Sequence, residues 1–216
     1  MKGLLVKDFR LMKGQKNFYF IIAAIAIGIA AISDDSSFLL GLPLVLSLFT
    51  LNTISYDEFD NGNAFLFTLP VSRADYVIEK YCFAFLIGCS AWIFTIFLAL
   101  VLGLLSVKAD VSETMVTAMA VLPAVIVIQA IMIPFQLKFG AEKGRIALLG
   151  ALGVLFMISI VLVKAAKMLK IDTANFVNHL PMISKSTATA MVLVILVIIL
   201  LLSLKASISI MKHKEF

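Results

Sequence analysis

The segment Tyr56-Asp57-Glu58-Phe59-Asp60 combines two aromatic rings and three carboxylates within five residues. Its two rings are three residues apart, a spacing that places both on one face of a helix. Aromatic rings anchor well in apolar pockets of a partner protein, and carboxylates beside them can meet basic residues of that partner. We therefore predict a docking segment here, with an ordinary solvated loop as the alternative reading of the same composition.

Three polar residues, Asn52, Thr53 and Gln129, lie within otherwise apolar runs and are candidates for a substrate path. Amide side chains in membrane helices also hydrogen-bond to neighbouring helices, so a structural role for Asn52 and Gln129 is at least as well supported. No ionisable residue lies near the middle of an apolar run. This absence disfavours a proton-coupled carrier, because such carriers keep titratable groups at depth.

The sequence contains no pattern that predicts a catalytic, cofactor-binding or metal site on this chain. Cys82, Cys89, His179 and His213 do not occur in metal-ligand spacing, and the G-x-x-x-x-G-K-[ST] phosphate-binding loop is missing. Work against a gradient would therefore need energy from a partner protein.

Composition favours an integral membrane protein with a single domain over residues 1–216. The chain is 62% hydrophobic and 14% charged, and its mean hydropathy is +1.09, well above the range of soluble proteins. Its net charge of +5 does not indicate nucleic-acid binding, because the basic residues punctuate apolar runs and do not gather on one solvated face.

We predict an all-α fold with six transmembrane helices, since six apolar runs approach the ~20 residues that cross a bilayer. The runs are Phe18–Ile32, Phe38–Ile54, Tyr81–Val107, Met115–Leu137, Ile146–Val163 and Ala188–Leu204. An even number of spans puts both termini on one side. Most of the 18 Lys and Arg residues then fall on that side, which predicts cytoplasmic termini in the cell membrane.

Residues 1–17 are expected to form an amphipathic interfacial helix in contact with membrane lipids. Leu5, Phe9 and Met12 share one helical face, whereas basic residues such as Lys7 and Arg10 occupy another. Such a helix can bury its apolar stripe at the acyl boundary while its cations meet anionic headgroups. A tail that only sets the topology is the alternative.

Residues 56–76 form the longest predicted cytoplasmic loop. Within it, Ser72-Arg73-Ala74-Asp75 is typical of a capping box, in which Ser72 and Asp75 satisfy free backbone groups at a helix start. We therefore expect the helix of the third span to begin in the cytoplasm.

Two stretches of this chain resemble small permease subunits of type-2 ABC exporters. The first comprises Glu58, Gly62, Leu69-Pro70-Val71-Ser72-Arg73 and Lys80-Tyr81. The second comprises Pro134-Phe135-Gln136-Leu137-Lys138-Phe139-Gly140 and Glu142-Lys143-Gly144-Arg145. With the basic amino terminus and six predicted spans, the resemblance covers essentially the whole chain.

The resemblance implies two permeases, identical or related, that work with two separate ATPase subunits binding ATP and Mg. Tyr56, Asp57, Glu58, Phe59 and Asp60 would be the coupling helix that rests on the ATPase, and Lys138, Glu142, Lys143 and Arg145 a second cytoplasmic contact. Family members export amphipathic peptides such as phenol-soluble modulins, confer immunity to antimicrobial peptides, or extrude sodium.

Without acidic residues at depth, an amphipathic peptide or lipid-like cargo fits this chain better than sodium. Two other functions stay open from the sequence. One is a membrane sensor or immunity protein that binds a peptide without transporting it, and the other is an ion-coupled secondary carrier.

Overall fold

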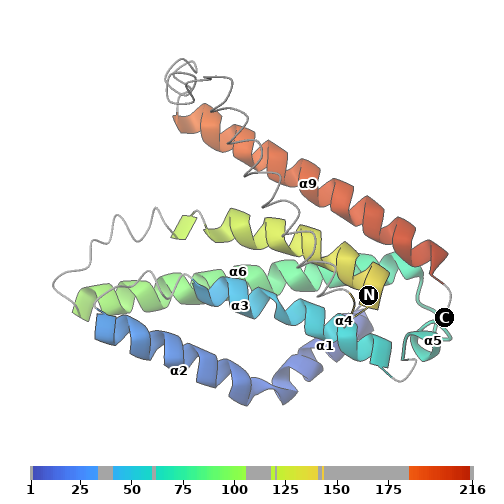
Figure 1. Ribbon diagram of the computed structural model, residues 1–216, viewed down its shortest axis with the longest axis horizontal. Coiled ribbons are helices and arrows are strands. Elements are labelled where there is room, and N and C mark those ends of the chain that lie inside the picture. The colour runs from blue at the N-terminus through green and yellow to red at the C-terminus, as the bar shows by residue number, and fades with distance from the viewer. Residues whose placement is uncertain are drawn as a thin grey trace, which may run out of the picture.

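The computed structural model describes residues 2–33, 41–59, 62–105, 118–119, 121–140, 143 and 185–214. All regular structure in these ranges is helical (Figure 1). The helices are α1 (Lys2–Gly14), α2 (Lys16–Ser33), α3 (Leu42–Ser47), α4 (Phe49–Glu58), α5 (Gly62–Leu66), α6 (Arg73–Leu105), Val121–Gly140 and α9 (Lys185–His213).

Three of these helices are long and apolar enough to cross a membrane. They contain the segments Arg73–Val101, Val121–Gly140 and Ala190–His213, and α2 adds a shorter apolar segment, Lys16–Ile29. The prediction of an all-α membrane protein is therefore confirmed at this level. The count of six spans stays a prediction, and the predicted fifth run, Ile146–Val163, lies outside the described residues.

The amino-terminal helix α1 packs onto α4 and α6 through a face that differs from the predicted apolar stripe. Its buried residues are Leu4 and Asp8, which are one helical turn apart. Phe9 is partly exposed and meets Phe83 of α6 edge to face, with ring centroids 5.3 Å apart. The stripe prediction missed this face because Asp8, a charged residue, is buried by pairing with a lysine of α6.

The loop between the second and third predicted spans is largely ordered into helix ends. Tyr56, Asp57 and Glu58 form the last turn of α4, and the extended Phe59 ends that helix. The separate short helix of the loop is α5. At the start of α6, the Asp75 backbone N–H donates to Ser72 Oγ at 3.0 Å, which confirms the predicted cap by Ser72. The Asp75 carboxylate accepts a 2.7 Å hydrogen bond from the Ser72 hydroxyl.

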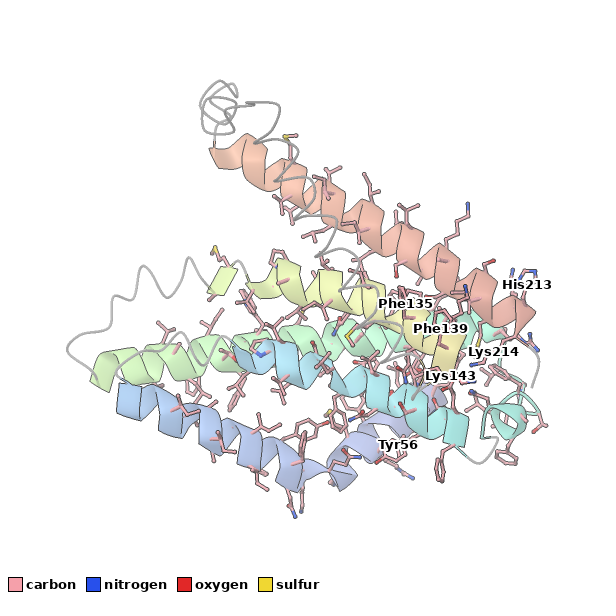
Figure 2. The ribbon with its side chains drawn as sticks, viewed as in Figure 1. Tyr56, Phe135, Phe139, Lys143, His213 and Lys214 are labelled. Atoms are coloured by element: carbon pink, nitrogen blue, oxygen red, sulfur yellow. The ribbon has the colours of Figure 1, made fainter. Side chains whose placement is uncertain are left out.

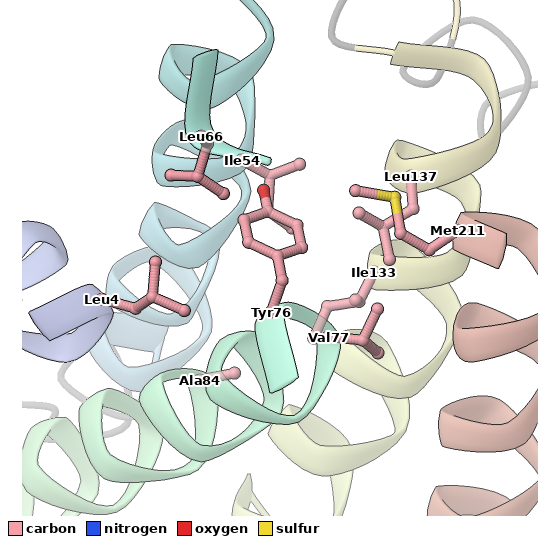
Figure 3. Close-up of a cluster of buried hydrophobic side chains, with 9 residues drawn as sticks. All are labelled: Leu4, Ile54, Leu66, Tyr76, Val77, Ala84, Ile133, Leu137 and Met211. Atoms are coloured by element: carbon pink, nitrogen blue, oxygen red, sulfur yellow. The ribbon is translucent and has the colours of Figure 1, made fainter. Parts of the chain in front are cut away.

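The main apolar core lies where α1, α4, α5, α6, Val121–Gly140 and α9 converge (Figure 3). Tyr76 and Val77 of α6 are fully buried at its centre. The other members are Leu4, Ile54, Leu66, Ala84, Ile133, Leu137 and Met211. One cluster thus joins segments from both ends of the chain, and Figure 1 places the amino and carboxyl ends at the same end of the bundle.

Helix α6 and the Val121–Gly140 helix approach closely at Gly88. A Cβ atom added at Gly88 would lie 3.1 Å from Val125 Cγ1 and 3.5 Å from Gln129 Nε2. The missing side chain therefore permits this helix contact, as small residues commonly do in membrane helices.

We predict that Gly88→Leu destabilises the fold by about 1–3 kcal/mol, because the added side chain overpacks the contact with Val125. Thermal unfolding of the purified protein in detergent would measure the change. Gly28→Leu is the matched control, since a Cβ at this helical glycine meets nothing within 4 Å. Equal melting temperatures for the two variants would contradict the assignment.

Candidate functional site

Both chain ends lie at one end of the helix bundle, which we call the charged end (Figure 1). There, one lysine joins three helices. The Lys80 Nζ of α6 lies 2.5 Å from Asp8 Oδ2 of α1 and 2.8 Å from Asp57 Oδ2 of α4. It also donates to Thr53 Oγ1 at 3.1 Å. Lys80, Asp8 and Thr53 are fully buried, and Asp57 is nearly so.

The Asp57 carboxylate also accepts hydrogen bonds from two further side chains. Its Oδ1 accepts a charged hydrogen bond from Lys7 of α1, and its Oδ2 accepts one from the Tyr76 hydroxyl of α6 at 3.1 Å. Thr53 and Asp57 are four residues apart on α4, so both project from one helical face toward Lys80. The Asp57 carboxylate is therefore directed into the protein and is not presented at the surface.

The cluster contains three carboxyl groups and two ammonium groups. Glu79, the third carboxyl, is fully buried and has no hydrogen-bond partner, and its Oε2 lies 3.9 Å from Lys80 Nζ. Lys7 is the only member with substantial exposure, at 31% of its side chain. Burying charges is expensive unless they are paired, so the position of Lys80 between Asp8 and Asp57 is tightly constrained.

A second polar cluster at the charged end brings together two segments that the sequence predicted separately. A pocket of about 300 Å³ is lined by Glu58, Asn63, Ala64, Lys138, Phe139, Gly140 and Lys214. Lys214 Nζ donates to Glu58 Oε1 at 2.6 Å and to the Leu137 carbonyl at 2.9 Å. The end of α4, the end of Val121–Gly140 and the residue after α9 are thus linked.

Gly140 is required by this arrangement. Its φ angle is +78°, which favours glycine, and a Cβ there would lie 3.2 Å from Glu58 Oε2. The glycine therefore lets the Val121–Gly140 helix end directly against the Glu58 side chain.

Aromatic side chains form the outer surface of the charged end. Tyr56, Phe59 and Phe65 are 50%, 73% and 72% exposed. Figure 2 shows Tyr56, Phe139, Lys143 and Lys214 at this end of the molecule. The Tyr56 hydroxyl accepts a 2.6 Å hydrogen bond from Gln15 Nε2, which links the outer surface to the junction between α1 and α2.

The predicted substrate-path residues occupy different environments. Thr53 belongs to the Lys80 cluster, whereas Gln129 is buried and donates through Nε2 to the Ala84 carbonyl of α6 at 3.0 Å. That bond is the structural role the sequence left open for Gln129. Asn52 is half-buried on α4.

Of the predicted contact residues, Lys138 and Lys143 are exposed, while Asp60, Glu142 and Arg145 lie outside the described residues. Within the described ranges, no group of His, Cys, Asp and Glu side chains could hold a metal ion.

Sequence reasoning missed Asp8, Tyr76, Glu79 and Lys80 as members of one cluster. A signal was present for Asp8, the only acidic residue among the basic residues of 1–17. It also lies four residues after Leu4, so the two share a helical face. The partners on α6 carried no comparable signal, because charged residues at the end of a span normally face water.

In a comparison with protein families, residues 3–212 match the family described as ABC-2 family transporter protein. Searches of curated proteins and of solved structures found no match.

We predict that Lys80→Met lowers the free energy of unfolding by about 3–5 kcal/mol, because it leaves the buried Asp8 and Asp57 with the partly exposed Lys7 as their one remaining cation. Chemical unfolding of the purified protein in detergent would measure it. Lys205→Met is the control, since Lys205 is exposed on α9 and its loss should change stability by no more than about 0.5 kcal/mol. The network would not be stabilising if the two variants unfolded alike.

Proposed function

The chain belongs to the ABC-2 family of transporter proteins, and we propose that it is the permease subunit of an ATP-driven exporter of amphipathic or hydrophobic substrates. The match covers nearly the whole chain, so the membrane domain itself is the family domain. The sequence lacks the phosphate-binding loop of an ATPase. ATP and Mg are therefore bound by separate ATPase subunits, and the permease pairs with a second copy or a related permease.

The observation that carries this proposal is the opposite orientation of neighbouring side chains at the end of α4. Tyr56 and Phe59 face outward, while Asp57 and Thr53 are fixed to Lys80 on α6. A force applied to the exposed rings would be passed to α6 through this ion pair, and to α1 through Asp8. A partner ATPase that binds these rings would thus move α1, α4 and α6 together.

The same geometry refines the roles within the coupling segment. Tyr56 and Phe59 supply the anchor, and Asp57 transmits its motion within the permease because its carboxylate is directed inward. Glu58 is tied to Lys214 and borders the pocket that Lys138 also lines. Lys138 and Lys143, together with Asp60, Glu142 and Arg145, extend the contact surface for the ATPase.

An amphipathic peptide or lipid-like substrate is supported by the apolar character of the helices beyond the charged end. From Tyr81 to Leu105 on α6, and from Val121 to Leu137, no ionisable side chain other than Tyr81, Cys82 and Cys89 occurs. These stretches contain no acidic side chain, which disfavours sodium as the cargo. Asn52, Thr53 and Gln129 are the proposed residues of the substrate path. Thr53 and Gln129 already form hydrogen bonds within the permease.

The proposed topology has six spans, with the charged end in the cytoplasm of the cell. Basic residues from distant parts of the chain, among them Lys7, Lys138 and Lys214, gather at that end. Their position is the one that the positive-inside rule assigns to the cytoplasmic side. The end that carries the aromatic surface would then face the ATPase.

We predict that the double variant Tyr56→Ala, Phe59→Ala loses its ATPase, with each truncation costing about 2 kcal/mol of association as buried interface aromatics commonly do. The measurement is retention of the co-expressed ATPase on the purified permease, followed by ATP-driven export from vesicles. Phe97→Ala is the control, because Phe97 is also exposed, at 61%, but lies toward the other end of α6 from the charged end.

If the double variant retains its ATPase and transports normally, the coupling assignment is wrong and the contact lies elsewhere, such as at Lys138 to Arg145. If the wild-type permease associates with no ATPase at all, a sensor or immunity protein that binds a peptide without transport becomes the better function.

For the topology, we predict that Gly3→Cys reacts with a membrane-impermeant maleimide only after the cells are permeabilised, whereas Asp35→Cys reacts on intact cells. Both variants are made in a background lacking Cys82 and Cys89, the two cysteines of the chain. Gly3 is exposed on α1, and Asp35 lies outside the described residues in a predicted outer loop. The opposite labelling pattern would invert the topology.

A further inference from the structure

An apolar pocket separates the first turns of α2 from α6. Its volume is about 430 Å³, and its walls include Tyr19, Phe20 and Ala23 of α2 and Ile87, Ala91 and Phe94 of α6. This volume is within the range of pockets that hold small molecules. None of the described side chains of α2 is buried, so the apolar side chains that line the pocket on this helix are not covered by other parts of the described chain.

The lining residues of the pocket extend along both helices. Lys16 to Ala23 covers about 10 Å of α2 at 1.5 Å per residue, and Ile87 to Phe94 covers the same length of α6. Beyond it, Ile22, Ala26 and Ile27 pack against a small core around Leu42 and Ala99. A length of about 10 Å accommodates most of the hydrocarbon of one leaflet, which is about 15 Å deep.

A single cation, Lys16, lies among the lining residues. It is the first residue of α2 and is exposed, and no acidic side chain of the described ranges forms an ion pair with it. It directly follows the basic helix α1, so this end of the pocket is the one nearest the membrane surface. The pocket therefore offers an apolar slot with one positive charge at its mouth.

We propose that this pocket binds one anionic phospholipid, with an acyl chain in the slot and the headgroup phosphate on Lys16. A zwitterionic lipid could fill the slot equally well but would gain less from Lys16, because its positive headgroup offsets the phosphate. The lipid completes the apolar packing of α2 against α6. The site stands independently of the proposed ATPase contact, since none of its lining residues belongs to the charged-end pocket or to the Lys80 cluster.

The test is native mass spectrometry of the purified full-length permease after incubation with equal amounts of phosphatidylglycerol and phosphatidylcholine. We expect one retained lipid, with phosphatidylglycerol favoured about fivefold, the factor that one basic residue near a membrane surface provides. Lys16→Gln should abolish the preference. Lys13→Gln is the matched control, because Lys13 is an exposed lysine near the end of α1 that does not line the pocket.

A second variant separates this site from lipid bound elsewhere. Ala23→Phe fills the slot and should lose both lipids, whereas Lys16→Gln should lose only the selectivity. The proposal is overturned if the wild type retains no lipid or both lipids equally, if Lys16→Gln keeps the preference, or if Ala23→Phe still retains a lipid. Disulfide crosslinking of two chains through Phe20→Cys, with Cys82 and Cys89 removed, would instead assign the pocket to a contact between permease copies.

Discussion

Burying the ammonium group of Lys80 requires compensating carboxylates, and these come from two different helices. Asp8 on α1 and Asp57 on α4 approach the same nitrogen from separate elements, so moving either helix away from α6 would separate a buried ion pair. Such an arrangement contributes little net stability compared with apolar residues, but breaking it is costly. The relative positions of α1, α4 and α6 at the charged end therefore follow from one set of ion pairs.

Two further basic residues of the charged end, Arg73 and Lys214, bind the ends of neighbouring helices. Arg73 Nη1 donates to the carbonyls of Met211 and Lys212 at the end of α9, and Lys214 donates to the carbonyl of Leu137. These carbonyls lack partners within their own helices, and cations near them also favour the helix dipole. Basic residues that the sequence analysis used to predict the topology therefore also join α6, α9 and the Val121–Gly140 helix.

The sequence predicted the features that depend on local pattern. Long apolar runs gave the helices α6, Val121–Gly140 and α9, and the Ser72–Asp75 spacing gave the start of α6. It could not predict which way Asp57 faces, because the same two aromatics and three acids suit a docking surface or a buried pair. That choice depends on Lys80, 23 residues further along the chain, and on Asp8, so it is a tertiary property. The spacing of residues in the sequence likewise could not predict that Glu58 lies in one pocket with Lys138 and Gly140.

Strong and weak contacts are distributed unevenly over the described part of the chain, and this distribution limits how the protein can change shape. Ion pairs hold α1, α4 and α6, whereas the described side chains of α2 make only partly buried apolar contacts. Packed cores and buried ion pairs shift between discrete arrangements more readily than they deform. A conformational change that keeps the Lys80 cluster intact would therefore carry α1, α4 and α6 as one unit. Relative motion would occur at apolar interfaces such as that of α2, where no buried charge must be separated.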